Sequence, residues 1–337
     1  MITIDCHTHL MQGEARRLLA RSRQSGVQRF NVLAVPSLCG ARNNIDCLAL
    51  KRLAPGSVYA FGGLVWQAGH CPRPEEQLRL MMRSGFDGLK LLESKPTTQK
   101  ALGFHPQDAQ FAAMFAYAQA ENIPILWHVG DPAPFWHLDQ APAFAVAEGW
   151  TYDKGGFAPL QQLYEDVETV LERYPRLKVI LAHFYFCSDD APHLERLLAR
   201  YPELKVDITP GIEMYHAFLK VRDFWQAFFE RHHARILMGS DMTDEDESSY
   251  MGNWQPMARV IRGTLRPEPF AEGDLAGRGF ELSDQALSAI WGGNFLALCD
   301  EPKAPGSQGL ADLLAFYRQH LDADSLAACE QAMAQFA

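Results

Sequence analysis

The sequence predicts an α/β protein, a (β/α)8 TIM barrel with additional helices near its C-terminal end. Eight short apolar, β-rich runs alternate along the chain with segments whose apolar residues recur every three or four positions. Strict alternation of strand and helix requires parallel strands joined by crossover helices, and eight such units close into a barrel. An open doubly wound sheet is the weaker alternative, because no glycine-rich turn follows the first strand.

The expected strands follow one another at regular intervals. They cover Ile2–Cys6, Gln28–Val35, Val58–Trp66, Asp87–Leu92, Ile123–Trp127, Leu177–Ala182, Leu204–Thr209 and Arg235–Met238. Segments between them, such as "PEEQLRLMMRSG" and "LQQLYEDVETVLERYP", have amphipathic helical spacing and end in Gly or Tyr-Pro. We expect a barrel over residues 1–299, and a linker with helices packed on the barrel over residues 300–337.

Composition describes an ordinary globular protein without the marks of a nucleic-acid or membrane partner. The net charge is −10, and Lys and Arg do not cluster. Seven scattered cysteines without a Cys-x-x-Cys pair argue against both a disulfide framework and a thiolate zinc site. Neither a signal-peptide pattern nor an apolar run of ~20 residues is present. We therefore expect a cytoplasmic protein that acts on a small molecule, with the C-terminal helices as a possible homo-oligomer surface.

Polar residues stand at the carboxyl ends of the expected strands, where a barrel builds its active site. "DCHTHL" places His7 and His9 after strand one, and strand four carries Lys90. The motifs "ILWHVGDP", "VILAHF" and "ILMGSD" place the remaining candidates after strands five, six and eight, namely His128, His183 and Asp241. All of these side chains should converge on one mouth.

This order of residues resembles the amidohydrolase superfamily, over roughly Met1 to Phe295. Its metal-dependent members have His-x-His after strand one, Lys or another residue at strand four, His after strands five and six, and Asp after strand eight. The chain is most similar to the amidohydrolase 2 branch, which includes lactonases, hydratases and decarboxylases related to aminocarboxymuconate semialdehyde decarboxylase. That branch begins directly with the metal-binding strand, so the resemblance implies a barrel without a flanking β-sandwich.

The resemblance implies a divalent metal held by His7, His9, His128 and Asp241. Imidazoles and a carboxylate suit Zn²⁺, and Mn²⁺ or Fe²⁺ accept overlapping ligand sets. One ion is the expectation. His183 is then a catalytic residue that contacts water or substrate, with a role as ligand as the alternative. Lys90 either binds a substrate anion or, if carboxylated, bridges two metals.

The expected reaction is hydrolysis of an ester, lactone or amide by a metal-bound hydroxide, with Asp241 moving the proton. Non-oxidative decarboxylation of an aromatic or unsaturated carboxylic acid is the alternative enzyme. A barrel with a structural metal or none, acting as a binding protein, is the non-enzymatic alternative.

Further candidates carry weaker signals. Arg42 could recognise a substrate carboxylate, because guanidinium pairs with it through two hydrogen bonds. Trp136 belongs to an aromatic loop after strand five that would either cover the substrate or pack on the barrel. Glu213 could face the substrate or begin a helix, and Asp5 could orient a metal ligand. The acidic run "DEDES" after Asp241 reads as a solvated turn or a lid.

Overall fold

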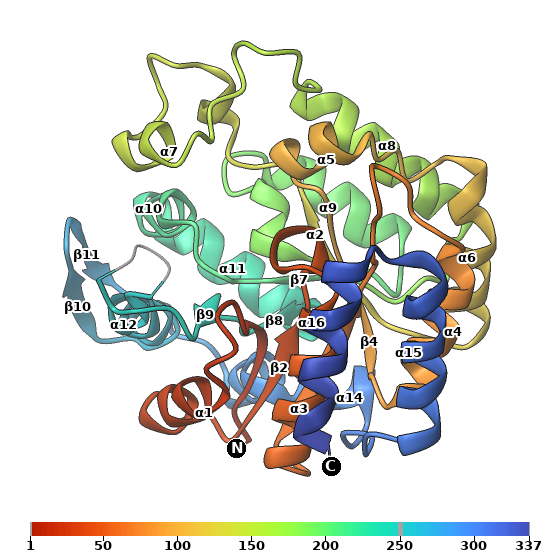
Figure 1. Ribbon diagram of the computed structural model, residues 1–337. Helices are drawn as coiled ribbons and strands as arrows, with labels where there is room; N and C mark the ends of the chain where they lie inside the picture. Colours follow the sequence, from red (N-terminus) through yellow and green to blue (C-terminus); the bar gives the residue numbers. More distant parts are fainter. Residues whose placement is uncertain (1, 249–251, 337) are drawn as a thin grey trace.

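The chain forms a parallel β-barrel surrounded by helices, shown in Figure 1 as a computed structural model that describes residues 2–248 and 252–336. Met1, residues 249–251 and Ala337 belong to the predicted ranges but lie outside the described residues. The strands are β1 Ile4–His9, β2 Arg29–Leu33, β3 Val58–Gly63, β4 Gly88–Ser94, β5 Ile125–Val129, β6 Val179–Leu181, β7 Lys205–Asp207, β8 Ile236–Leu237 and β9 Met242–Thr243. The predicted (β/α)8 class is confirmed.

The sheet runs in the order β8-β7-β6-β5-β4-β3-β2-β1-β9, and neighbouring strands are parallel. Two backbone hydrogen bonds join β1 to the segment that follows β8. The Cys6 N–H donates to the Met238 carbonyl, and the Asp241 N–H donates to the His7 carbonyl, both over 2.9 Å. The segment after β8 therefore lies against β1, which brings the first and last predicted site residues together.

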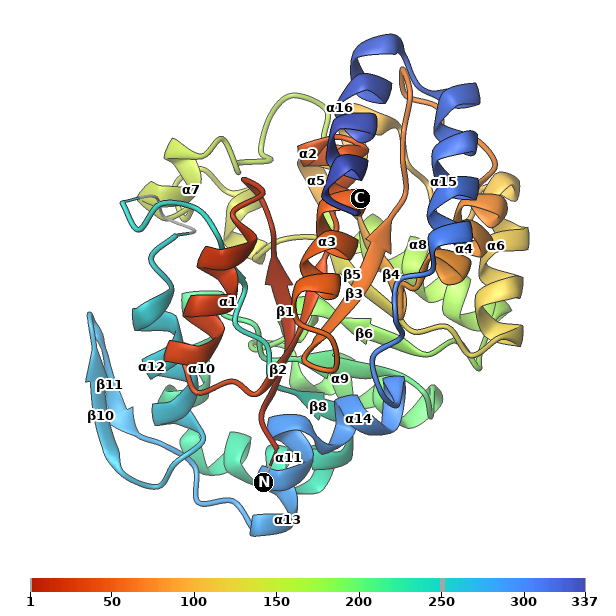
Figure 2. The same cartoon turned by 60° about the horizontal axis from the view of Figure 1, so that its bottom comes forward.

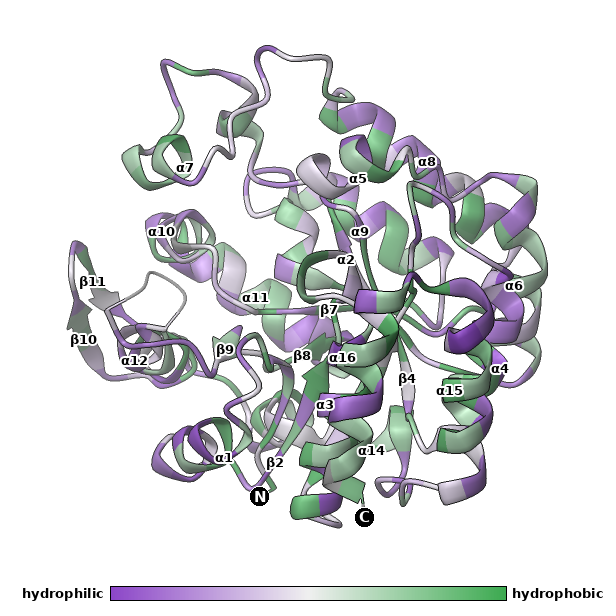
Figure 3. Cartoon of the chain, viewed as in Figure 1, coloured by the Kyte–Doolittle hydropathy of each residue, from purple (hydrophilic) through white to green (hydrophobic). Residues whose placement is uncertain are grey.

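Helices connect and cover the strands. They are α1 Ala15–Gln24, α2 Pro36–Cys39, α3 Arg42–Leu53, α4 Pro74–Ser84, α5 Pro96–Leu102, α6 Ala109–Ala120, α7 Ala143–Ala147, α8 Leu160–Arg173, α9 Ala191–Arg200, α10 Ile212–Lys220, α11 Arg222–His232, α12 Trp254–Thr264, α13 Asp284–Ser288, α14 Asn294–Cys299, α15 Ser307–His320 and α16 Ala323–Met333. Figure 3 shows that many of them carry a hydrophobic and a hydrophilic side, as their spacing predicts.

Two hydrophobic clusters stabilise the barrel. One lies between the strands and their helices, and the other includes strand residues such as Cys6, Leu126 and Ile180. Phe295 and Leu298 of α14 belong to this second cluster, and the Phe295 ring contacts the Tyr59 and Phe61 rings. Figure 2 shows α14 at the end of the barrel where the chain enters β1. The helix therefore closes the end opposite the predicted site.

The C-terminal helices lie against two helices of the barrel. Helix α15 contacts α4, and α16 contacts α3. A buried hydrogen bond of 2.9 Å joins the Asn44 amide to the Tyr317 hydroxyl. All seven cysteines are free. Within residues 2–248 and 252–336, no helix has the length and apolar character needed to cross a membrane.

Three local features differ from the sequence prediction. Strand β1 ends at His9 rather than Cys6, because Thr8 and His9 pair with β2 on one side and β9 on the other. Its register shifts between Asp5 and Thr8, so the histidines do not follow Asp5 in a regular two-residue alternation. A hairpin absent from the prediction, β10 Pro269–Glu272 and β11 Leu275–Arg278, follows α12.

The acidic run after Asp241 is only in part the solvated turn that its composition indicates, because Asp246 to Ser248 are exposed and Asp244 is not. Asp244 is fully buried, and its carboxylate accepts hydrogen bonds from the backbone N–H groups of Met11, Gln12 and Glu14. This carboxylate holds the loop after β1 against the loop after β9. It therefore stabilises the wall of the mouth beside the two histidines.

The longest loop lies between β5 and α8 and carries α7 away from the barrel (Figure 1). It has its own hydrophobic cluster, in which Phe135, Ala145 and Tyr152 are buried against neighbouring aromatic rings. Trp136 packs on the Tyr152 ring and donates a hydrogen bond to the Ala158 carbonyl. The loop is thus a small folded unit with its own hydrophobic core.

Candidate metal centre

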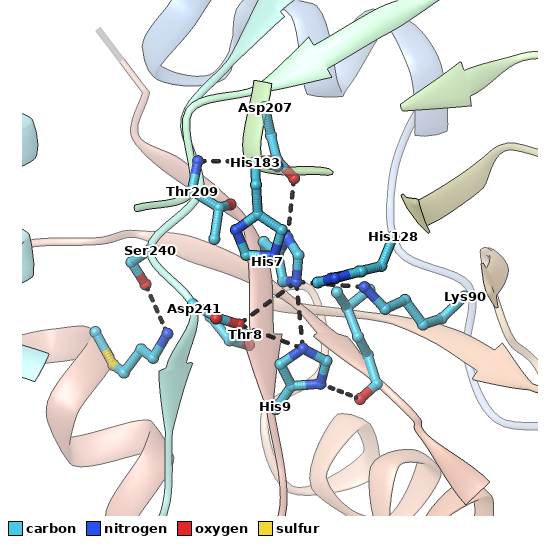
Figure 4. A network of polar contacts seen from close by, with 12 residues as sticks. His7, Thr8, His9, Lys90, His128, His183, Asp207, Thr209, Ser240 and Asp241 are labelled. Carbon is cyan, nitrogen blue, oxygen red and sulfur yellow. Dashed lines mark hydrogen bonds and ion pairs between the residues drawn. The ribbon is translucent and has the colours of Figure 1, made fainter. Parts of the chain in front are cut away.

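Three metal-ligating atoms converge at the carboxyl ends of β1 and β8 (Figure 4). The Nε2 atoms of His7 and His9 lie 3.2 Å apart. The Asp241 Oδ1 atom lies 3.5 Å from the first and 3.4 Å from the second. Both imidazoles are buried, whereas the Asp241 side chain keeps 21% of its surface exposed toward the mouth. This group has one open side.

The opposite nitrogens of the two rings fix which atoms face the centre. His7 Nδ1 lies 2.9 Å from the Asp207 carboxylate, and His9 Nδ1 lies 3.1 Å from the Leu33 carbonyl. Both partners only accept, so each Nδ1 carries the proton and each Nε2 presents a lone pair. Two lone pairs and a carboxylate oxygen facing one another repel unless a cation lies between them. The donor set therefore fits a divalent metal ion.

Asp207, at the end of β7, connects three elements of the site. Besides His7, its carboxylate accepts hydrogen bonds from the backbone N–H groups of His183 at 2.8 Å and Thr209 at 3.1 Å. It is not among the residues that sequence patterns single out, although a charged residue ending the buried run "LKVD" is a signal of the same kind as the others. Asp207 is thus the carboxylate that orients His7, a candidate metal ligand.

Asp5 has a different role from the predicted one. Its carboxylate accepts from the Ser240 backbone N–H and hydroxyl and from the His7 backbone N–H, and contacts no imidazole among the described residues. Burial raises the pKa of Asp5 to about 7. The carboxyl thus fixes the turn that presents Asp241, whose φ of 58° is a left-handed conformation that Asp tolerates better than most residues.

His183 follows β6 in a turn of unusual backbone geometry. Four consecutive residues, His183 to Phe186, have φ between 51° and 57° although none is glycine. Such a conformation costs roughly 1–2 kcal/mol per residue. The Asp207 bond to the His183 N–H and the stacking of the His183 and Phe186 rings, 5.2 Å apart, hold the turn in place. The His183 ring lies 5.2 Å from the His7 ring, beside the donor set.

His128 is close to this group, but its Nε2 atom is bonded outside it. Its ring centroid lies 4.8 Å from that of His183, yet its Nε2 atom is 2.9 Å from the Gly130 carbonyl and 3.3 Å from the Asp131 carboxylate. Asp131 also accepts two hydrogen bonds of 2.8 Å from Lys95, and one from Tyr152. The structure therefore joins His7, His9 and Asp241, and leaves the predicted fourth ligand hydrogen-bonded elsewhere.

Lys90 lies beside the donor set and is almost completely buried. Its Nζ atom is 3.4 Å from His7 Nε2, and burial lowers the pKa of Lys90 to about 8. Arg42 forms an ion pair of 2.9 Å with Asp46 on α3. Arg42 and Trp136 do not belong to the described residues that line the mouth.

Burial controls the ionisation of the donors. It lowers the pKa of His7 well below the usual range and that of His9 to about 3, with Lys90 adding to the effect. It raises the pKa of Asp241 to about 6, which Lys90 partly offsets. Burial would raise the pKa of Asp131, but the Lys95 ammonium and the contacts with His128 together outweigh it and hold that pKa at about 2. At neutral pH both imidazoles of the donor set are therefore uncharged.

A cavity of about 230 Å³ opens above the donors. Its floor contains His7, His9, His128, His183 and Asp241. Apolar side chains form most of its wall, including Leu38, Leu92, Phe135, Phe144, Trp150, Phe186, Trp254 and Met257. The mouth can therefore enclose a small, largely apolar molecule with one end at the donor set.

Solved structures share this fold. A TIM-barrel protein from Bordetella bronchiseptica is 15% identical, covers 88% of this chain and 98% of its own, and superposes with a TM-score of 0.56. An IDCase from Metarhizium anisopliae is 13% identical, with 88% and 97% covered and a TM-score of 0.51. An amidohydrolase from Mycoplasma synoviae is 10% identical, with 94% of both chains covered and a TM-score of 0.50.

No protein-family model and no curated protein matches the sequence. At these identities the structural likeness shows the fold alone, which is the TIM barrel that the sequence predicts. The particular reaction follows from the site rather than from the fold.

Proposed function

We propose that this protein is a metal-dependent hydrolase of the amidohydrolase type that cleaves an ester, lactone or amide bond of a small molecule. One observation carries the proposal: two imidazole nitrogens and a carboxylate oxygen face one another within 3.5 Å at an open barrel mouth. Zn²⁺ suits these donors best, with Mn²⁺ or Fe²⁺ as alternatives. When bound, one such ion would polarise a carbonyl and lower the pKa of water.

Each residue of the proposed site then has a defined role. His7, His9 and Asp241 would hold the ion, with Asp207 fixing the His7 tautomer. Asp241 would accept the proton of the attacking water and return it to the leaving group, a role that suits a carboxyl whose pKa burial raises to about 6. His183 would donate a hydrogen bond to the carbonyl oxygen or to the attacking water. His128 would line the floor beside the ion, with its Nε2 atom bonded to the Gly130 carbonyl.

Decarboxylation of an aromatic or unsaturated acid is the second candidate. The Lys90 ammonium beside His7 favours it, because a cation near the metal would attract a substrate carboxylate. In that reaction the carboxylate would lose CO₂, and a neighbouring acid would protonate the remaining carbon.

Product analysis separates the two candidates. The Zn²⁺-loaded protein is incubated in H₂¹⁸O with aryl esters, lactones and amides, and separately with aromatic and unsaturated carboxylic acids. Hydrolysis incorporates ¹⁸O into the acid product, whereas decarboxylation releases CO₂ without consuming water. Asp241→Asn is the control and should lower the rate by about 100-fold or more. Turnover that proceeds equally in Asp241→Asn or in chelator-treated protein would contradict both candidates.

A further inference from the structure

A carboxylate without a counter-charge faces the cavity above the donor set. Glu213 lies in the first turn of α10 and lines the cavity. Its carboxylate bonds to its own backbone N–H, and it forms no ion pair with any described residue. The carboxylate folds over Gly211, where a Cβ atom would collide with it. The glycine thus leaves the space that Glu213 occupies at the rim.

The charges around Glu213 are negative. Burial, together with the carboxylates of Asp131 and Asp189, raises the pKa of Glu213 to about 7. Among the described residues that line the cavity, Lys95 is the only Lys or Arg, and both of its short bonds go to Asp131. Glu245 adds another carboxylate to the rim. An anionic ligand would meet repulsion here, whereas a cation would gain a partner.

Aromatic rings complete the surroundings. Phe144 of the long loop, Phe186 after β6 and Trp254 of α12 line the same cavity, whereas the Trp150 ring already has the Lys95 ammonium 4.5 Å from its centroid. The faces of aromatic rings attract cations, and a nearby carboxylate adds a full charge to that attraction. An apolar wall with an unpaired acid at its rim matches a molecule that has an apolar body and a positive end.

We propose that the cavity selects substrates that carry an ammonium or similar cationic group on an apolar or aromatic body, and that Glu213 pairs with this cation. The inference rests on the proposed function in taking this cavity as the substrate site. It places the scissile bond at the donor set and the positive group at the rim. Glu213 is then a specificity residue, and Asp241 remains the proton carrier.

Calorimetric binding to the Zn²⁺-loaded full chain tests this selection without turnover. The cationic probe is benzyltrimethylammonium, which keeps its charge at every pH and does not ligate metals, and the neutral probe is benzyl alcohol. Glu213→Gln should weaken binding of the cation about tenfold, because it removes a partly desolvated counter-charge. Binding of benzyl alcohol should change by less than about twofold, since its contacts are apolar.

Two further variants locate the effect. Glu245→Gln is the matched control and should change cation affinity less than Glu213→Gln does. Gly211→Ala keeps the charge but displaces the carboxylate, so it should also weaken cation binding. Equal losses in Glu213→Gln and Glu245→Gln, unchanged cation affinity in Glu213→Gln, or no cation binding by the wild type would overturn the inference. Hydrolysis with no preference for cations would refute this inference alone, whereas selective cation binding without hydrolysis would refute the proposed reaction alone.

Discussion

Two histidine–carboxylate contacts lie in the same mouth and have opposite consequences. Asp207 bonds Nδ1 of His7 and leaves Nε2 facing the donor set. The Asp131 carboxylate lies 3.3 Å from Nε2 of His128, and it also accepts hydrogen bonds from Lys95 and Tyr152. The first contact prepares a ligand, and the second belongs to a clamp that fastens the long loop to the barrel. The two contacts therefore differ in which nitrogen the carboxylate engages, Nδ1 in His7 and Nε2 in His128.

The largest expected effect is on metal content, which tests whether His9 and His128 differ in their contribution to metal binding. His9→Ala removes one of three converging donors, and the purified variant should retain less than about a tenth of an equivalent of metal. His128→Ala should retain at least about half, because its Nε2 atom is bonded to Gly130 and not to the donor set. Mass spectrometry of chelator-free protein measures both. Equal metal loss in the two variants would place His128 among the ligands and remove the distinction.

The clamp should control stability rather than metal binding. Lys95→Met leaves the buried Asp131 carboxylate without its ammonium, which should lower the free energy of unfolding by about 3 kcal/mol. Urea denaturation measures the loss. Lys100→Met is the matched control on α5, where an exposed ammonium bonds the Gly155 carbonyl, and it should cost below about 1 kcal/mol. Similar losses in the two variants would mean that the Lys95–Asp131 pair is not a clamp.

Asp207→Asn tests the contact between Asp207 and His7. The amide can offer a donor where His7 needs an acceptor, so the ring can take the tautomer that protonates Nε2. Metal affinity should fall about 10- to 100-fold, as expected for loss of a carboxylate that orients a ligand. Competition with a fluorescent chelator gives the dissociation constant. Asp131→Asn should leave that constant within about threefold, and a comparable fall would show that both carboxylates support the metal.

The pH dependence of metal affinity should give the smallest effect. Since burial raises the pKa of Asp241 to about 6 and lowers that of His9 to about 3, only the carboxyl gains a proton as the pH falls from 6 to 5. Metal must displace that proton, so affinity should fall by up to about tenfold per pH unit, and no more. Titrations at pH 5.0, 5.5 and 6.0 measure the slope. A fall approaching a hundredfold per unit would show that the histidines are protonated as well.

Much of the fold and the central donors follow from local patterns. The alternation of β-rich and amphipathic runs predicts the barrel, and strand-end placement predicts that His7, His9 and Asp241 meet. The clamp does not follow, because Lys95, Asp131 and Tyr152 are separated by 36 and 21 residues. Sequence spacing does not indicate which of several charged residues at a mouth become partners.

The backbone geometry of the site does not follow from the sequence either. The left-handed turn from His183 to Phe186 contradicts the preferences of its residues. The bond to Asp207, the hydrogen bond from the Tyr164 hydroxyl to the Tyr185 carbonyl and the packing of the rings stabilise it. Asp244 likewise belongs to an acidic run that composition assigns to solvent, but three backbone N–H groups meet its carboxylate in the fold.

The sequence by itself determined the order of elements and the residue types at the strand ends, because hydrophobic periodicity and strand alternation are local properties of the chain. Tertiary structure alone decided which nitrogen of each histidine faces the centre, and which carboxylates are neutralised by a cation. Those outcomes depend on hydrogen bonds between residues up to two hundred positions apart. The same contacts left Glu213 without a counter-charge at the rim.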